Sequence, residues 1–134
     1  IQDRVIKEDI IDWNDSPENT AFQIVLENEK TWVHHDDFHW GGVLYLTPDA
    51  PVESGTSIYQ HKETGVSLWD GVRGSETDLS PNEDWEEIVF IGNKFNRLVL
   101  YNGRYYHSSK LSGFGTDLET GRLTQTFFFN VRTK

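Results

Sequence analysis

Short apolar runs separated by turn residues dominate the pattern of hydrophobic and polar positions along the chain. The runs are rich in valine, isoleucine, threonine and aromatic residues, as β-strands are. We expect strands over residues 22–26, 31–34, 43–47, 56–60, 66–69, 86–91, 97–101, 104–107 and 122–131. The one helical expectation is a short N-terminal helix over residues 3–13. This pattern predicts a single all-β domain over residues 1–134, built as a sandwich, a jelly roll or a barrel.

The clearest local signal is Asn102-Gly103, because Asn-Gly between two β-like runs is typical of a two-residue type I′ hairpin. In that register His107 falls opposite Leu98. The face that they share is otherwise apolar, since it carries Leu100 and Tyr105. We therefore expect this face, and His107 with it, to point inward.

Composition narrows the classes of function. Eight Phe, five Trp and five Tyr indicate a folded chain rather than a disordered one. A formal net charge of −10 repels phosphate backbones and anionic lipid, so we expect neither general nucleic-acid binding nor membrane binding. The absence of cysteine excludes disulfides, cysteine-based zinc sites and a cysteine nucleophile, which leaves histidine and carboxylate as metal ligands.

The absence of a long apolar run and of methionine gives two further expectations. No apolar run is long enough for a membrane helix and no signal peptide is evident, so we expect a cytoplasmic protein. Methionine is absent, even at position 1, so we expect the chain to be N-terminally truncated or processed from a longer reading frame. The sequence does not predict an oligomeric state.

One segment, residues 70–87, differs in composition from the rest. It holds seven acidic residues and one basic residue, Arg73. We expect a solvated surface loop, because connecting segments usually lie on the surface. A mobile lid over a site is the alternative, since long irregular loops in compact domains often have that role.

The run His34-His35-Asp36-Asp37 holds the candidate chemistry, and it follows the β-like residues 31–33. On a strand its first and third residues face one way, and its second and fourth face the other. Either pair supplies two of the three ligands of a 2-His-1-carboxylate iron(II) site, and the residues alone leave the choice between the pairs open. His107 is the candidate third ligand, against the alternative of a core histidine bonded to a backbone carbonyl.

Arg122 and Thr124 lie two residues apart on the last run, so they share a face. A guanidinium binds a carboxylate through two parallel hydrogen bonds, and a hydroxyl can add a third, which suits the far end of a small dicarboxylate. An exposed arginine paired with one of the many acids is the alternative. The opposite face of this run is more apolar, so either both faces are covered or a bulge turns Arg122. Tyr45 is either a core aromatic or a phenol that bonds the same carboxylate.

The order of these residues resembles that in the iron(II)/2-oxoglutarate-dependent oxygenases. It is most similar to the prolyl-hydroxylase-like group and to small members of that superfamily from marine microbial and phage genomes. The matching stretches are residues 33–36, 40–48, 55–59, 96–101, 107–109 and 121–125.

The resemblance implies a double-stranded β-helix, the jelly-roll fold of cupins. The iron(II) ligands that it implies are His34, Asp36 and His107. The residues that it implies for the distal carboxylate of the co-substrate 2-oxoglutarate are Arg122, Thr124 and Tyr45. Enzymes of this kind use dioxygen to decarboxylate 2-oxoglutarate to succinate and carbon dioxide and to hydroxylate a prime substrate, which the sequence does not identify. The metal supplies the chemistry, and the protein supplies the geometry and a dry pocket.

Two other functions remain open at this point. A cupin-like metal enzyme without 2-oxoglutarate would have no need of Arg122. A non-catalytic β-sandwich, such as a sugar-binding or phage structural module, would suit the five Trp residues and the acidic loops. His39 and His61 are expected at the surface.

Overall fold

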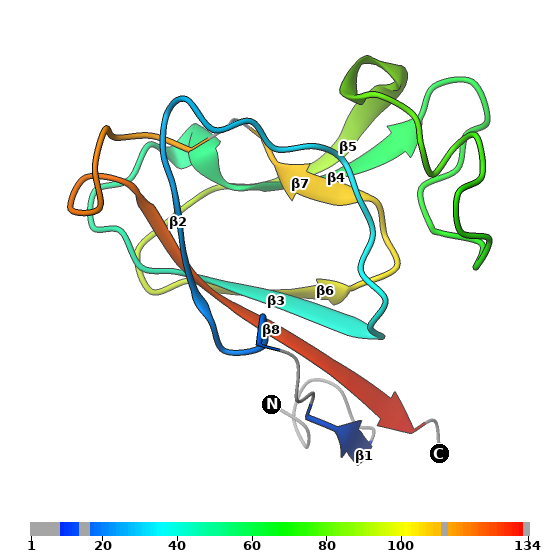
Figure 1. Ribbon diagram of the computed structural model, residues 1–134, viewed down its shortest axis with the longest axis horizontal. Coiled ribbons are helices and arrows are strands. Elements are labelled where there is room, and N and C mark those ends of the chain that lie inside the picture. Colours follow the sequence, from blue (N-terminus) through cyan, green and yellow to red (C-terminus); the bar gives the residue numbers. More distant parts are fainter. Residues whose placement is uncertain (1–8, 14–16, 111–112, 133–134) are drawn as a thin grey trace.

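The protein consists of two antiparallel β-sheets, as the computed structural model shows (Figure 1), and the described residues are 9–13, 17–110 and 113–132. The larger sheet has the order β1 (Asp9–Asp12), β8 (Arg122–Arg132), β3 (Trp40–Tyr45) and β6 (Leu98–Asn102), and β2 (Phe22–Val25) also pairs with β8. The smaller sheet has the order β5 (Trp85–Ile91), β4 (Thr56–His61) and β7 (His107–Ser109). Two short 3₁₀ turns, η2 (Val52–Ser54) and η3 (Asn82–Asp84), complete the elements. The prediction of an all-β protein is confirmed.

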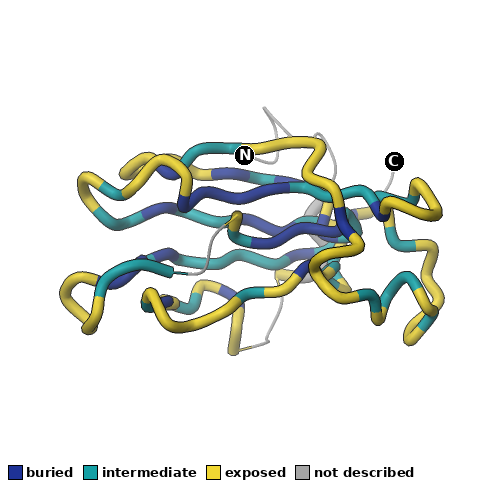
Figure 2. Tube along the Cα trace, turned by 90° about the horizontal axis from the view of Figure 1, so that it is seen from above, coloured by how far each residue is buried: buried dark blue, intermediate teal, exposed yellow. Residues whose placement is uncertain are grey.

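Successive strands cross between the two sheets, and this crossing assembles the site. The chain passes from β2 in the large sheet to residues 31–34, where His34 forms an isolated bridge with His107 of β7. It then returns to β3 in the large sheet and crosses again to β4. Segments far apart in the sequence therefore lie side by side. Most buried residues lie in the strands, and most loop residues are exposed (Figure 2).

Most expected strands are present, with shifted ends, but the strand expected over residues 104–107 is wrong, because Tyr105 forms a single bridge and only His107 belongs to a strand. Three further expectations are also wrong. Residues 31–34 and 66–69 form single bridges rather than strands, at His34 and at Leu68. The N-terminal helix is wrong where it can be compared, because residues 9–12 form β1 along the edge of β8; residues 3–8 lie outside the described residues. Within the described part of the chain, no helix has the length and apolar character needed to cross a membrane.

The expected hairpin at Asn102-Gly103 is also wrong. β6 pairs with β3 in the large sheet whereas β7 pairs with β4 in the small one, so the turn carries the chain from one sheet to the other. Neither residue has the positive φ that a type I′ turn requires. Glycine is needed here for another reason, since a Cβ on Gly103 would lie 2.4 Å from the carbonyl oxygen of Phe38. The backbone of this crossing passes too close to its neighbour for any side chain.

The inward face of β6 is the reverse of the expected one. Leu98 is exposed, and the buried residues are Val99 and Tyr101, which pack with Tyr45 between the sheets. His107 is buried as expected, but β7 places it there and not a hairpin. His61, expected at the surface, is buried as well, with its Nε2 bonded to the hydroxyl of Ser80.

Both faces of β8 are covered, which settles the alternatives left by its sequence. Phe129 and Val131 are buried on its outer face, where Trp13 stacks on Phe129 with ring centroids 5.6 Å apart. Arg122 and Thr124 are buried on the other face, toward the small sheet. Arg122 and Thr124 are therefore buried although the opposite face of β8 is the more apolar one.

Candidate metal centre and adjoining pocket

A bridge between two backbone segments places two histidines side by side. The amide of His34 donates to the carbonyl of His107, and the amide of His107 donates back, at 3.0 and 2.8 Å. The two rings stand with centroids 4.5 Å apart. Asp36 follows two residues later, with its amide bonded to the carbonyl of Gly103. Its carboxylate oxygens lie 3.8 Å from Nε2 of His34 and 3.3 Å from Nε2 of His107.

The hydrogen bonds of both imidazoles direct Nε2 toward this point. Nδ1 of His34 lies 2.9 Å from the carbonyl oxygen of Trp32, and Nδ1 of His107 lies 2.6 Å from that of Tyr105. A carbonyl only accepts, so each Nδ1 carries a proton, and in the neutral ring Nε2 is the nitrogen with the lone pair that can bind a metal. This backbone contact is the kind that orients metal-bound histidines. Partial desolvation of the His34 ring, whose side chain is still 45% exposed, and the neighbouring His107 lower the pKa of His34, which favours the neutral form that a metal needs.

The oxygen of Asp36 that faces His107 is buried and has no hydrogen-bond partner among the described residues. A proton on Nε2 of His107, or a metal cation between the two atoms, would stabilise their separation of 3.3 Å. One ligand atom from each of His34, Asp36 and His107 lies within 4.8 Å of the others. Ligand atoms at about 2.1 Å from a six-coordinate ion stand about 3 Å apart in adjacent positions, so small side-chain shifts would bring all three onto a divalent cation. The residues present fit such an ion.

The other half of the run faces away from this cluster. Nε2 of His35 lies 2.9 Å from a carboxylate oxygen of Asp78, and Asp37 pairs with Arg73. The alternation expected for a strand therefore holds over these residues, and it brings His34 and Asp36 to His107. Asp78 and Arg73 belong to the acidic segment 70–87, no residue of which lines the cavity beside the cluster. That segment lies behind the ligands and does not cover them.

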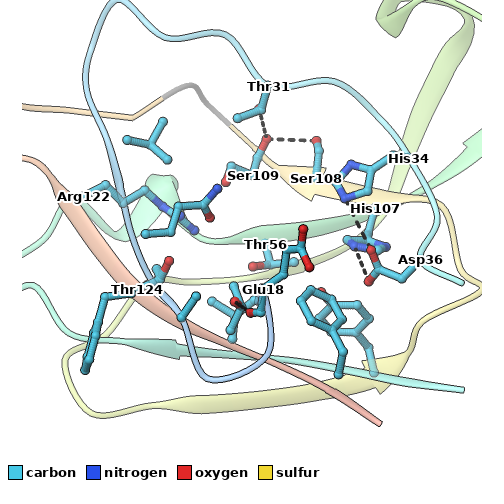
Figure 3. Close-up of a pocket in the computed structure, with 18 residues that line it drawn as sticks. Glu18, Thr31, His34, Asp36, Thr56, His107, Ser108, Ser109, Arg122 and Thr124 are labelled. Atoms are coloured by element: carbon cyan, nitrogen blue, oxygen red, sulfur yellow. Dashed lines mark hydrogen bonds and ion pairs between the residues drawn. The ribbon is translucent and has the colours of Figure 1, made fainter. Parts of the chain in front are cut away.

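A cavity of about 350 Å³ adjoins the candidate metal cluster, formed by His34, Asp36 and His107, between the sheets (Figure 3). Arg122 lies in its wall and is only 3% exposed, with Nε donating to the carbonyl of Ser54 at 2.9 Å. No acid lies within ion-pair distance of Arg122 among the described residues. The buried hydroxyl of Thr124 likewise has no partner there. A buried guanidinium without a counter-ion carries a large desolvation cost, so this wall is suited to an anion.

Tyr45 agrees with the first of its two alternatives, a core aromatic, because it is fully buried and is not among the residues that line the cavity. Its hydroxyl is bonded to that of Thr56 at 2.7 Å, and its ring lies 5.7 Å from the guanidinium carbon of Arg122. Burial raises the pKa of Tyr45, so the phenol stays protonated. Tyr45 therefore packs against Arg122 and does not line the cavity itself.

Sequence reasoning missed Tyr101, which lines the cavity with its ring centroid 4.5 Å from that of His107. Burial and the charge of Asp36 raise the pKa of Tyr101 well above its usual value, so it stays neutral beside the cluster. The signal was present in the alternation of Val99 and Tyr101, but the apolar appearance of Leu98 and Leu100 favoured the other face. Thr56, Ser108 and Glu18 also line the cavity and were not anticipated.

We expect Gly41→Ala to weaken metal binding by displacing the carboxylate of Asp36. A Cβ at Gly41 would stand 2.8 Å from the ring of Tyr101 and 3.0 Å from the buried oxygen of Asp36, so the carboxylate must shift. Metal affinity should fall by about tenfold, as for changes to groups that orient ligands. The measurement is a calorimetric titration with a divalent metal. Gly42→Ala is the matched control, because its Cβ meets Leu100 instead; equal losses in both variants would contradict the prediction.

We expect Tyr45→Phe to lower the free energy of unfolding without impairing anion binding. The variant loses the buried hydrogen bond to Thr56, which contributes about 1 kcal/mol. Chemical denaturation measures the first effect, and a 2-oxoglutarate titration measures the second. A tenfold loss of 2-oxoglutarate affinity would mean that the phenol contacts the ligand after all.

Comparison with known proteins gives one similarity. The chain is similar over residues 75–129 to the model of a family described as a family of unknown function (DUF6445). The matched segment includes His107, Arg122 and Thr124, but it begins after His34 and Asp36. No curated protein and no solved structure matches the chain.

Proposed function

We propose that the protein is an iron(II)- and 2-oxoglutarate-dependent dioxygenase. The observation that carries the proposal is a single cavity with a 2-His-1-carboxylate cluster and a buried arginine in its wall, the arginine lacking a counter-ion among the described residues. The cluster suits iron(II), because these three ligands leave other coordination positions open. The arginine suits the distal carboxylate of a dicarboxylate that reaches the metal with its other end.

The chain's own residues would have distinct tasks. Two neutral imidazoles and one carboxylate would hold the ion, and Arg122 with Thr124 would fix the co-substrate in one orientation. The sheets around the cavity would exclude water, which strengthens the contacts of Arg122. Iron and the 2-oxo acid, when bound, would supply the oxidative chemistry.

The same proposal extends to the fold, which we assign to the double-stranded β-helix, or jelly roll. What supports it is the strand order. With residues 31–34 counted beside β7, the small sheet has the order 31–34, β7, β4 and β5, and β2, β8, β3 and β6 follow one another in the large sheet. With β1 set aside, each sheet then has four strands, and from β2 onward the chain alternates between the sheets except from β4 to β5.

The test is an anaerobic titration of the purified protein with iron(II) and 2-oxoglutarate. The proposal predicts a weak visible charge-transfer band that needs both components and that is absent in His107→Ala. Iron binding without a band would favour a cupin-like metal enzyme that does not use 2-oxoglutarate. A folded protein that binds neither component would refute the proposal and favour a binding module.

A further inference from the structure

His35 lies between two of the three candidate ligands, yet its side chain is enclosed on the opposite side of the run. Its Nε2 lies 2.9 Å from a carboxylate oxygen of Asp78. Its ring stacks on Trp69 with centroids 4.1 Å apart and an interplanar angle of 8°, and Tyr106 meets it edge-on at 5.5 Å. With three different contacts and a side chain 10% exposed, His35 is held in one orientation.

The groups around His35 are fixed in turn by the rest of the fold. Tyr106 is 1% exposed, donates its hydroxyl to Asp78 at 3.3 Å and packs on Trp85 at 4.4 Å. The amide of Trp69 donates to the carbonyl of Arg104, whose guanidinium donates back to the carbonyl of Trp69. These contacts leave Asp78 at the centre of the cluster, with hydrogen-bonding contacts to both His35 and Tyr106.

This cluster is connected through the backbone to all three candidate ligands. His35 is the residue between His34 and Asp36, and Tyr106 directly precedes His107. A carboxylate that fixes both neighbours therefore fixes the spacing between the two backbone segments that supply the ligands. Asp78 lies within the segment similar to the family of unknown function, as do Tyr106 and His107.

We propose that Asp78 is a positioning residue for the metal centre, acting through His35 and Tyr106 and not by contact with the ion. The inference rests on the metal centre of the proposed function. Asp78 fixes the backbone from which Asp36 and His107 project, so that their ligand atoms are in place before the ion binds. Outer contacts of this kind change metal affinity by about 10–100-fold when they are lost.

The experiment titrates cobalt(II) alone, because its visible absorption reports the number and geometry of its ligands without need of a co-substrate. For Asp78→Ala we expect a loss of affinity of about tenfold or more and an altered cobalt spectrum. Asp78→Asn should lie between Asp78→Ala and the wild type, since its amide oxygen can still accept a hydrogen bond. The matched control is Arg73→Ala, which removes the exposed ion pair of the same acidic segment to Asp37 and should change neither quantity.

The outcomes separate the inference from the proposed function. If the wild type binds cobalt(II) and Asp78→Ala gives the same affinity and spectrum, the inference is overturned while the proposed function stands. A lower melting temperature of the metal-free Asp78→Ala protein with an unchanged cobalt spectrum would also overturn it, because Asp78 would then serve stability alone. If the wild type binds cobalt(II) but not 2-oxoglutarate, the proposed function fails, and the comparison of the two Asp78 variants still decides the inference.

Discussion

Asp36→Ala is expected to remove metal binding from an otherwise folded protein. The substitution deletes the one anionic ligand of the cluster and leaves two neutral imidazoles, which cannot offset the charge of a divalent cation. Loss of an outer contact already costs about 10–100-fold in metal affinity, so loss of a direct ligand should exceed about a hundredfold. The same variant removes a buried oxygen that has no hydrogen-bond partner among the described residues, so the metal-free protein should lose no more stability than its 3.3 Å contact with His107 contributes.

The control for this variant is the adjacent residue. Asp37→Ala removes the same chemical group one position along the chain, but Asp37 faces away from the cluster and pairs with Arg73 in an exposed ion pair. Calorimetric titration with iron(II) or cobalt(II) under anaerobic conditions measures both variants. Comparable metal affinity in Asp36→Ala and Asp37→Ala would show that the cluster is not the binding site.

Alternation along a strand predicted which residues of the run share a face, and the structure agrees with that grouping. The choice between the two pairs was beyond local reasoning, because it depends on what lies on each side of the run. His107 of β7 contacts Asp36 on one side of the run, and Asp78 of the acidic segment contacts His35 on the other. Both contacts join residues far apart in the sequence, and no local pattern encodes them.

His107 shows how a correct expectation can rest on a wrong premise. The Asn-Gly signal correctly marked a reversal of the chain, but it does not specify whether the next strand pairs with the previous one or crosses to another sheet. Glycine is required at position 103 because the backbone there passes too close to the carbonyl of Phe38 for a side chain. Crossing also reversed the buried face of β6, so Tyr101 beside the metal cluster was not found.

Arg122→Met is expected to abolish 2-oxoglutarate binding and to spare metal binding. A guanidinium that grips a carboxylate through two hydrogen bonds contributes about 1.5–3 kcal/mol for each, so affinity should fall by more than about a hundredfold. Burial lowers the pKa of Arg122, which reflects the cost of keeping its charge inside the protein. Methionine fills a similar volume without that charge, and removal of the buried charge should offset the lost bond from Nε to the carbonyl of Ser54, so the metal-free variant should be as stable as the wild type or more so. A stable protein that has lost only co-substrate binding is the signature of an anion site.

The comparison of three proteins tests this signature. Iron(II) affinity, 2-oxoglutarate affinity and the free energy of unfolding are measured for the wild type, Arg122→Met and Arg122→Lys. Lysine keeps the charge but loses the planar fork, so it should retain part of the 2-oxoglutarate affinity and none of the gain in stability. If Arg122→Met binds 2-oxoglutarate as the wild type does, the arginine is not the carboxylate site. If it loses several kcal/mol of stability, Arg122 is a structural residue, held by its bond to the carbonyl of Ser54 and its packing on the ring of Tyr45.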